Sequence, residues 1–191
     1  MFFEYPNDTN TFALQYQYFY GNSILVAPVT EENSTTGSVY LPNDQFYDFY
    51  THAPVKGTGS TITLPDVDYT TIPLYIKGGS IIPIRSSSAN TTTELRTKDF
   101  NILVAPGTDG TASGCLYLDD GDSLVQTATS VIEFSYADGK FSMTGTFGYD
   151  AGNVGIASIT LLGSGSSNVT SNNKLAQKQI PLTGEYSVQL R

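Results

Sequence analysis

Ile72-Pro-Leu-Tyr-Ile-Lys-Gly-Gly-Ser-Ile-Ile-Pro-Ile84 contains two short apolar runs on either side of a pair of glycines. The runs Leu74–Ile76 and Ser80–Ile84 are rich in aromatic and β-branched residues, which suit a pleated, half-buried surface. Gly78 and Gly79 allow the positive φ angles that a tight turn or a bulge requires. The stretch therefore predicts two strands joined by a sharp turn, although periodicity alone assigns them no function.

Similar runs lie on both sides of this stretch, separated by segments rich in turn residues. The predicted strands are Ile24–Val29, Gly37–Leu41, Gln45–Asp48, Gly59–Leu64, Leu74–Ile84, Phe100–Ala105, Ala112–Leu118, Ser130–Tyr136, Lys140–Phe147, Ile156–Leu162 and Tyr186–Leu190. Asp138-Gly139, between two of these runs, is a strong signal for a two-residue hairpin turn. Short strands at this spacing predict a mainly β protein with two antiparallel β-sandwiches.

The first twenty residues follow a different pattern. Met1–Tyr5 is an almost continuous apolar run, which is typical of a parallel strand covered on both faces. Such a strand needs neighbours joined through long crossovers, and the rest of the sequence offers no such unit. We therefore expect it to insert into a sheet made by another polypeptide. Phe12–Tyr20, ended by Gly21, has aromatic residues at helical spacing and predicts a short helix with its aromatic stripe in a core.

Five blocks of the sequence share their order with a known family. The blocks are Met1-Phe-Phe-Glu-Tyr-Pro6, Gly21-Asn-Ser-Ile-Leu-Val-Ala-Pro-Val29, Val39-Tyr-Leu-Pro42 with Phe46-Tyr-Asp48, Ile72–Ile84 and Leu116-Tyr-Leu-Asp-Asp-Gly-Asp-Ser123. Through them the chain resembles glycoside hydrolase family 31, the family of α-glucosidases and α-xylosidases. Blocks in the correct order make a more specific signal than one block alone, and the match thins out after residue 125 or so.

This resemblance implies the last strand and a short helix of a (β/α) barrel at residues 1–21, followed by a proximal β-sandwich at 22–95 and a distal one at 96–191. It implies hydrolysis of terminal α-linked glucose from oligosaccharides with retention of configuration. The family's catalytic aspartates, and its substrate-orienting motifs, lie upstream of the block that matches Met1–Pro6. The resemblance therefore assigns this chain no catalytic, substrate-binding or metal-binding residue, and no cofactor.

The same resemblance implies a partner. We expect a larger N-terminal catalytic chain of the same precursor to carry the catalytic aspartates and to hold the α-glucoside oligosaccharide. Because Met1 falls inside the predicted strand, proteolytic processing after folding is the expected origin of the two chains. The present chain would complete and brace the barrel, and it should be inactive alone.

Asp119-Asp120-Gly121-Asp122 is the acidic stretch that most resembles a site. Neighbouring residues of a strand point to opposite faces, so Asp119 and Asp120 would not converge on one sugar bond. A calcium loop would need a glutamate after the glycine, which this sequence lacks. Asp and Gly suit a hairpin turn, so we interpret the stretch as structural, with calcium binding and catalysis as the weaker alternatives.

Several single residues have side chains that could take part in a site. His52, the sole histidine, is expected in a surface loop and makes a metal site improbable without other ligands. Glu4 could reach the substrate region of the partner, but we expect a structural bond to the backbone. Cys115, the sole cysteine, is expected to be buried, with a disulfide bridge to another chain as the weaker alternative. Four tyrosines could stack on a sugar or pack in a core, and packing is the preferred interpretation: Tyr40, Tyr47, Tyr50 and Tyr69.

Charge and modification motifs limit the partners and the location. With 18 acidic and 9 basic side chains, the net charge is −9, which disfavours binding to the phosphates of nucleic acid. No apolar run is long enough to span a membrane. The four Asn-x-Ser/Thr sequons, which are expected glycosylation sites of a secreted protein, are at Asn7, Asn33, Asn90 and Asn168.

The sequence is compatible with two alternatives. A stand-alone carbohydrate-binding or adhesive β-sandwich protein would also explain the composition, the sequons and the missing catalytic motifs. It would not explain the apolar run Met1–Tyr5 or the ordered blocks. An α-xylosidase would share the whole pattern, because residues of the barrel set the sugar preference within the resembled family.

Overall fold

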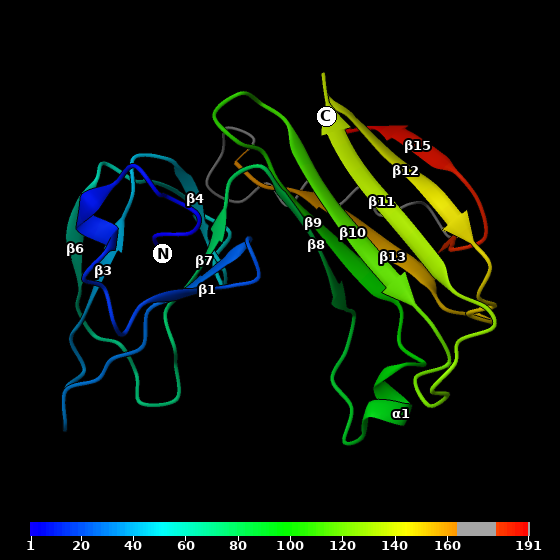
Figure 1. The fold of residues 1–191 in the computed structure, drawn as a ribbon, viewed down its shortest axis with the longest axis horizontal. Helices are drawn as coiled ribbons and strands as arrows, with labels where there is room; N and C mark the ends of the chain where they lie inside the picture. The colour runs from blue at the N-terminus through cyan, green and yellow to red at the C-terminus, as the bar shows by residue number, and fades with distance from the viewer. Residues whose placement is uncertain (164–178, 191) are drawn as a thin grey trace. The chain divides into compact units, whose positions relative to one another are not determined.

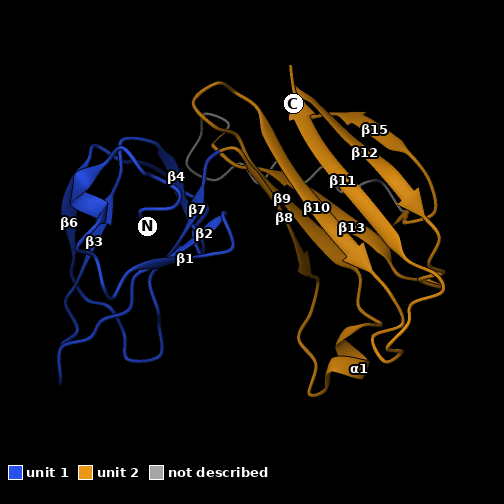
Figure 2. Ribbon diagram, in the orientation of Figure 1, with its two compact units in different colours: residues 1–78 blue, residues 79–191 orange. Residues whose placement is uncertain are grey.

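The structure is a computed structural model that describes residues 1–163 and 179–190 (Figure 1). Its ordered elements are almost all β-strands, which confirms the predicted mainly β class. The chain divides into two compact units, unit 1 from Met1 to Gly78 and unit 2 from Gly79 to Arg191 (Figure 2). No helix in the part of the chain that the structure describes is long and apolar enough to cross a membrane.

The elements follow one another closely in both units. Unit 1 contains a 3-10 helix and seven strands: η1 (Thr9–Thr11), β1 (Tyr18–Tyr20), β2 (Ile24–Val26), β3 (Gly37–Leu41), β4 (Gln45–Asp48), β5 (Pro54–Lys56), β6 (Ser60–Leu64) and β7 (Leu74–Lys77). The elements described in unit 2 are β8 (Ser80–Arg85), α1 (Thr92–Leu95), β9 (Phe100–Ala105), β10 (Ala112–Leu118), β11 (Ser130–Ala137), β12 (Lys140–Phe147), β13 (Gly155–Leu161), β14 (Ile180–Pro181) and β15 (Tyr186–Gln189).

Unit 1 is built from two antiparallel sheets. Five strands pair in the order β1-β2-β7-β4-β5, while β3 and β6 form a separate two-stranded sheet. Both sheets contribute to one cluster of buried side chains: Leu25, Ala27, Val39, Leu41, Phe46 and Tyr75. Burying one large apolar side chain stabilises a fold by about 1.5–3 kcal/mol, so this cluster holds the two sheets together.

Unit 2 consists of one long sheet in the order β14-β13-β9-β8-β10-β11-β12-β15. Two of its pairs, β8 with β10 and β9 with β13, are parallel, and the other pairs are antiparallel. Every second residue of β11 is buried, which is the two-residue period of a strand with one face in a core. The sheet is strongly curled (Figure 1). Because of this curl, every strand from β8 to β14 contributes side chains to one apolar cluster.

The Gly78-Gly79 turn joins β7 of unit 1 to β8 of unit 2. It has the predicted sharp geometry, with a φ of 87° at Gly79. The sequence placed the boundary between the two β domains at 95/96, whereas the compact units meet at this turn. The reason is that β8 pairs along its whole length with β9, from Ser80↔Ala105 to Arg85↔Phe100, and so belongs to the later sheet.

The Asp138-Gly139 hairpin is confirmed. Asp138 and Gly139 have φ angles of 51° and 77°, and the flanking residues Ala137 and Lys140 pair with each other. Two consecutive positive φ angles define the type I′ turn, whose twist matches that of the strands it joins. Local sequence therefore sets the register of β11 against β12.

The expectations for the first twenty residues are wrong in two respects. Met1–Tyr5 forms a turn rather than a strand, and the N–H groups of Glu4 and Tyr5 both donate to the Met1 carbonyl oxygen at 3.1 Å. No strand in the residues described here pairs with this segment, so it folds back on itself. The helix expected at Phe12–Tyr20 is also absent. Its last three residues instead form β1, which pairs with β2 through the turn at Gly21.

Cys115 is exposed, which corrects the expected burial. Residues with even numbers in β10, such as Leu116 and Leu118, face the core. Cys115 has an odd number and therefore faces outward, because side chains alternate between the two sides of a strand. The three sequon asparagines that the structure describes, Asn7, Asn33 and Asn90, are exposed, whereas Asn168 lies outside the described residues.

Candidate functional site

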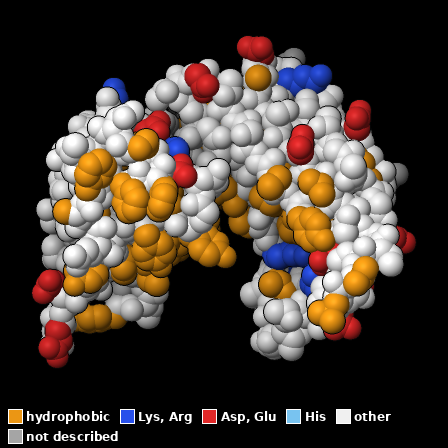
Figure 3. Space-filling model, viewed as in Figure 1, with side chains coloured by type: hydrophobic (Ala, Val, Ile, Leu, Met, Phe, Trp, Pro, Cys, Tyr) orange, Lys and Arg blue, Asp and Glu red, His pale blue; other side chains and the backbone are white. Residues whose placement is uncertain are grey.

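Unit 1 carries a group of exposed aromatic side chains near the start of the chain. Phe3 and Tyr20 are the most exposed, at 86% and 74%. Figure 3 shows apolar side chains gathered on the face of unit 1 where residues 1–20 lie in Figure 1. We call this group the aromatic surface, and its members are Phe2, Phe3, Phe12, Tyr16, Tyr18 and Tyr20.

This exposure is energetically costly. Full burial of one such side chain is worth about 1.5–3 kcal/mol, so leaving several of them in water forgoes a large stabilisation. Exposed apolar side chains that gather on one face of a soluble protein commonly mark a site of interaction with other proteins or ligands. The sequence had predicted that the stripe Phe12, Tyr16, Phe19 and Tyr20 packs in a core. Only Phe19 is half-buried, because β1 alternates its side chains between the two faces of the sheet.

Lys77 attaches the first residues of the chain to β7. Its ammonium group forms an ion pair with Glu4 at 2.9 Å and lies 5.0 Å from the centre of the Tyr5 ring. The Tyr5 hydroxyl donates a hydrogen bond to Asp44 Oδ2 at 2.9 Å. Burial, with a smaller effect of the Asp44 carboxylate, raises the pKa of Tyr5, so its hydroxyl stays protonated and able to donate. Glu4 therefore has a structural role, but its partner is a side chain and not the backbone that the sequence suggested.

A second set of polar contacts attaches the segment around η1 to β3. The Tyr40 hydroxyl donates to Asp8 Oδ2 at 2.7 Å and accepts from the Asn10 side-chain amide at 3.2 Å. Asp8 also caps η1, because its carboxylate accepts the backbone N–H of Asn10 at 3.1 Å. Tyr40 is buried and serves this attachment, which agrees with the packing interpretation.

Gln17 closes part of the outer edge of β3. Its side-chain N–H donates to the Tyr40 carbonyl oxygen at 2.5 Å, and its side-chain oxygen accepts the Tyr40 N–H at 2.9 Å. A neighbouring strand would offer the same donor and acceptor to Tyr40, so one side chain replaces a strand residue here. Both residues are buried. No periodicity or motif could have indicated this contact, because it joins positions 23 residues apart.

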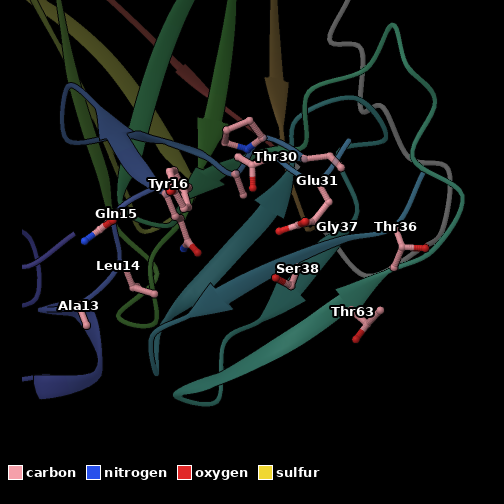
Figure 4. Close-up of a pocket in the computed structure, with 14 residues that line it drawn as sticks. Ala13, Leu14, Gln15, Tyr16, Thr30, Glu31, Thr36, Gly37, Ser38 and Thr63 are labelled. Carbon is pink, nitrogen blue, oxygen red and sulfur yellow. The ribbon is translucent and has the colours of Figure 1, made fainter. Parts of the chain in front are cut away.

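A groove of about 530 Å³ lies beside this contact. It is lined by residues 13–17, by residues 27–31, by the start of β3 and by Thr63. In Figure 4 the side chains of Glu31 and Ser38 lie near the middle of the groove, whereas Ala13 and Thr63 lie at its periphery. Tyr16 belongs both to this groove and to the aromatic surface.

The acidic stretch in unit 2 forms a hydrogen-bonded turn. Asp120 accepts the backbone N–H groups of Asp122 and Ser123, each at 3.0 Å, and Asp119 forms an ion pair with Arg96 at 3.2 Å. The hydroxyl and N–H groups that point at Asp120, led by the Ser123 hydroxyl, lower the pKa of this carboxyl. The geometry is that of the structural turn predicted from the sequence. No group of three or more His, Cys, Asp or Glu side chains within residues 1–163 and 179–190 could hold a metal ion.

The remaining candidates differ in their burial and their contacts. His52 has a φ of 61° in the turn after β4. Tyr47 is buried, as packing requires, whereas Tyr50 and Tyr69 are 55% and 74% exposed. The Tyr50 hydroxyl donates to the Ile72 carbonyl oxygen at 2.9 Å. The four tyrosines therefore form no common stacking platform.

Comparison with known proteins adds independent information. Residues 1–82 match the model of the glycosyl hydrolase family 31 C-terminal domain. The chain is 56% identical over 165 residues to the probable alpha/beta-glucosidase agdC of Aspergillus flavus, with 86% of this chain and 19% of that protein covered. It is 37% identical over 168 residues to an alpha-glucosidase of Schizosaccharomyces pombe, with 85% of this chain and 17% of that protein covered.

The fold also matches a solved structure. The glucosidase II alpha subunit in its alpha3-Glc2-bound form aligns with a TM-score of 0.77 and 24% identity, covering 87% of this chain and 20% of that one. At 24% identity this match shows that the two proteins share a fold. The chain spans about a fifth of the length of the curated relatives that it matches.

Proposed function

This chain belongs to glycoside hydrolase family 31 as part of the C-terminal region, and we propose that it is the non-catalytic C-terminal component of an α-glucosidase. In this proposal the whole enzyme hydrolyses terminal α-linked glucose from oligosaccharides with retention of configuration. The catalytic carboxylates and the α-glucoside are held by a larger N-terminal catalytic part. The present chain completes and braces the barrel of that part.

The aromatic surface is the observation that carries this proposal. Its six members all come from residues 1–20, the segment that the resemblance assigns to the end of the barrel. Docking against the catalytic part would remove these side chains from water. The attachments of this segment through Lys77, Asp8 and Gln17 would keep it fixed to unit 1 while its outer face binds.

The chemistry of the acidic residues agrees with a non-catalytic role. Retaining hydrolysis needs two carboxyl groups about 5–5.5 Å apart across the sugar bond. The acidic side chains considered above are engaged otherwise, Glu4 with Lys77, Asp119 with Arg96 and Asp120 within a turn. Their positions serve the fold, so the proposal assigns catalysis to residues outside this chain.

The location and the modification of the protein are part of the same proposal. We expect a secreted glycoprotein whose glycans lie at Asn7, Asn33, Asn90 and Asn168. The exposure of Asn7, Asn33 and Asn90 is compatible with attachment. Enzymatic removal of N-linked glycans followed by intact-mass measurement would show how many sequons are occupied, and no change in mass would refute the glycoprotein assignment.

Co-purification tests the docking role. The whole chain is expressed with its catalytic part, and Phe3→Ser is compared with Leu124→Ser, which replaces an exposed apolar side chain of unit 2. We expect Phe3→Ser to weaken co-purification and the Leu124 variant to behave like the unmodified chain. Equal recovery of the catalytic part with both variants would contradict the role of the aromatic surface.

Activity assays test whether catalysis requires the larger catalytic part. Maltose and 4-nitrophenyl α-glucoside should be hydrolysed by the complete protein and not by the present chain alone. Turnover by the isolated chain would refute the non-catalytic assignment. Preference of the complete protein for 4-nitrophenyl α-xyloside would assign an α-xylosidase instead.

A further inference from the structure

The outer edge of β3 is a partly open strand edge. Within residues 1–163 and 179–190, β3 pairs only with β6. The peptide N–H and C=O of Tyr40 point away from β6, because both bond to Gln17. Peptide groups alternate in direction along an antiparallel strand, so those of Ser38 and Thr36 point to the same outer side.

Side chains close this edge at its two ends. Gln17 occupies the position next to Tyr40. At the other end the Thr36 N–H donates to Ser34 Oγ at 3.0 Å, and Ser34 Oγ donates to the Thr36 carbonyl oxygen at 2.9 Å. Ser38 lies between these closures, and it lines the groove (Figure 4). Its peptide N–H and C=O point to the side of β3 on which Gln17, another residue of the groove lining, lies.

The electrostatics of the groove favour a basic occupant. Glu31 lines it and is exposed. Unit 1 contains eight acidic residues and two basic ones, Lys56 and Lys77, and neither lysine lines the groove. A positively charged group bound there would gain from this excess of negative charge.

We propose that the groove binds an extended peptide segment that pairs with Ser38 as a short added strand and places a basic side chain near Glu31. Addition of a strand to an open edge is a common mode of peptide recognition, in which main-chain hydrogen bonds provide the affinity. The closures at Thr36 and Tyr40 lie four residues apart, about 13 Å along the strand, which limits the segment to about three residues.

The source of the segment rests on the proposed function. Tyr16 is shared by the groove and by the aromatic surface, so a protein docked on that surface would lie next to the groove. We therefore assign the segment to the catalytic part. A second copy of this chain, or a sugar, would be a different occupant.

Nuclear magnetic resonance of the whole chain labelled with ¹⁵N tests the proposal with acetyl-Val-Lys-Val-amide as the probe. We expect a saturable downfield shift of the Ser38 amide proton and slower hydrogen exchange at this amide. The same peptide with methylated backbone nitrogens should lose this effect, because it cannot donate to the Ser38 carbonyl oxygen. Glu31→Gln should weaken binding about two- to fivefold, as loss of an exposed ion pair does. The matched control Glu32→Gln changes an exposed neighbour that does not line the groove and should leave binding unchanged.

Several outcomes would overturn the proposal. These are no response at Ser38, an equal response to the methylated peptide, or a response to maltose in place of the peptide. A Ser38 shift that depends on protein concentration without peptide would assign the edge to a second copy. Because the probe is tested on the isolated chain, peptide binding with no co-purification would refute the proposed function and the assignment of the segment to the catalytic part, and would leave the peptide site itself. Co-purification with no peptide binding would refute only this inference.

Discussion

Replacing Gln17 by alanine removes the side chain that takes the place of a strand at Tyr40. The change deletes one donor and one acceptor, which bond to the Tyr40 carbonyl oxygen and N–H at 2.5 and 2.9 Å. Tyr40 is only 6% exposed, so its peptide groups do not reach bulk water readily. The substitution therefore leaves two buried polar groups of the backbone without partners.

The expected loss of stability follows from this count. A buried donor or acceptor that loses its partner costs about 1–3 kcal/mol. Two such groups together give a loss of about 2–4 kcal/mol. This range lies toward the lower end of twice the single cost, because water in the adjacent groove can replace part of the lost hydrogen bonding. The effect should be confined to unit 1, where β3 and its neighbours lie.

Native-state hydrogen exchange of the whole chain measures this loss in each unit separately. We expect Gln17→Ala to lower the protection free energy of the Leu25 amide, in the core of unit 1, by about 2–4 kcal/mol and to leave that of Ile132 in unit 2 unchanged. Gln15→Ala is the matched control, because Gln15 is an exposed glutamine two positions away. A loss below about 0.5 kcal/mol, equal to that of the control, would refute the view that Gln17 acts as a strand partner.

Gly114→Ala should destabilise unit 2 by about 1–3 kcal/mol, because a Cβ at Gly114 would lie 2.0 Å from a backbone carbonyl oxygen of β8. Thermal unfolding measures this loss. Gly184→Ala is the control, because no atom lies within 4 Å of its added Cβ, and it should have no such effect. The Ser123 hydroxyl and its neighbours lower the pKa of Asp120 from 3.8, so its carboxylate contributes stability that is present above that value and lost as the pH falls through the lower pKa of the folded state. Asp120→Asn should therefore reduce the dependence of urea midpoints on pH between about pH 2 and 5, and an unchanged dependence would contradict this. Phe3→Ser should lower the self-association of the isolated chain measured by light scattering, because it removes an apolar side chain that is 86% exposed. Unchanged scattering would contradict the view that the aromatic surface causes this association.

The strands that sequence predicted best are those whose signals are local. Gly37–Leu41, Phe100–Ala105 and Lys140–Phe147 occur with the predicted bounds. Their apolar residues meet a core, with alternate burial at Phe141 and Met143 in the last of them, and Asp138-Gly139 sets the turn before that strand. No distant contact is needed to define these elements.

The errors arise where contacts with other segments outweigh the local pattern. The aromatic spacing in Phe12–Tyr20 favours a helix, but the bonds of Gln17 to β3 and the pairing of β1 with β2 hold the end of this segment in another conformation, with Tyr18–Tyr20 as a strand. The boundary differed because the partners of β8 are β9 and β10, which follow it in the sequence by 15 or more residues. Sequence alone does not reveal which sheet a strand joins.

The candidate site was only partly predictable. The sequence indicated that the apolar start of the chain binds another polypeptide, but as a strand, whereas the structure presents Phe2 and Phe3 on an exposed turn. No motif or periodicity in the sequence indicates the groove beside β3. Its lining combines residues 13–17, residues 27–31 and the start of β3, which only the fold brings together.

The most direct test of the proposed function is a native-mass measurement of the protein purified from its source, combined with a maltose assay of each species. We expect these 191 residues to be found with a larger catalytic polypeptide, joined to it or bound to it, and maltose hydrolysis to follow that larger species. A native protein that consists of this chain alone, with no larger companion, would contradict the assignment.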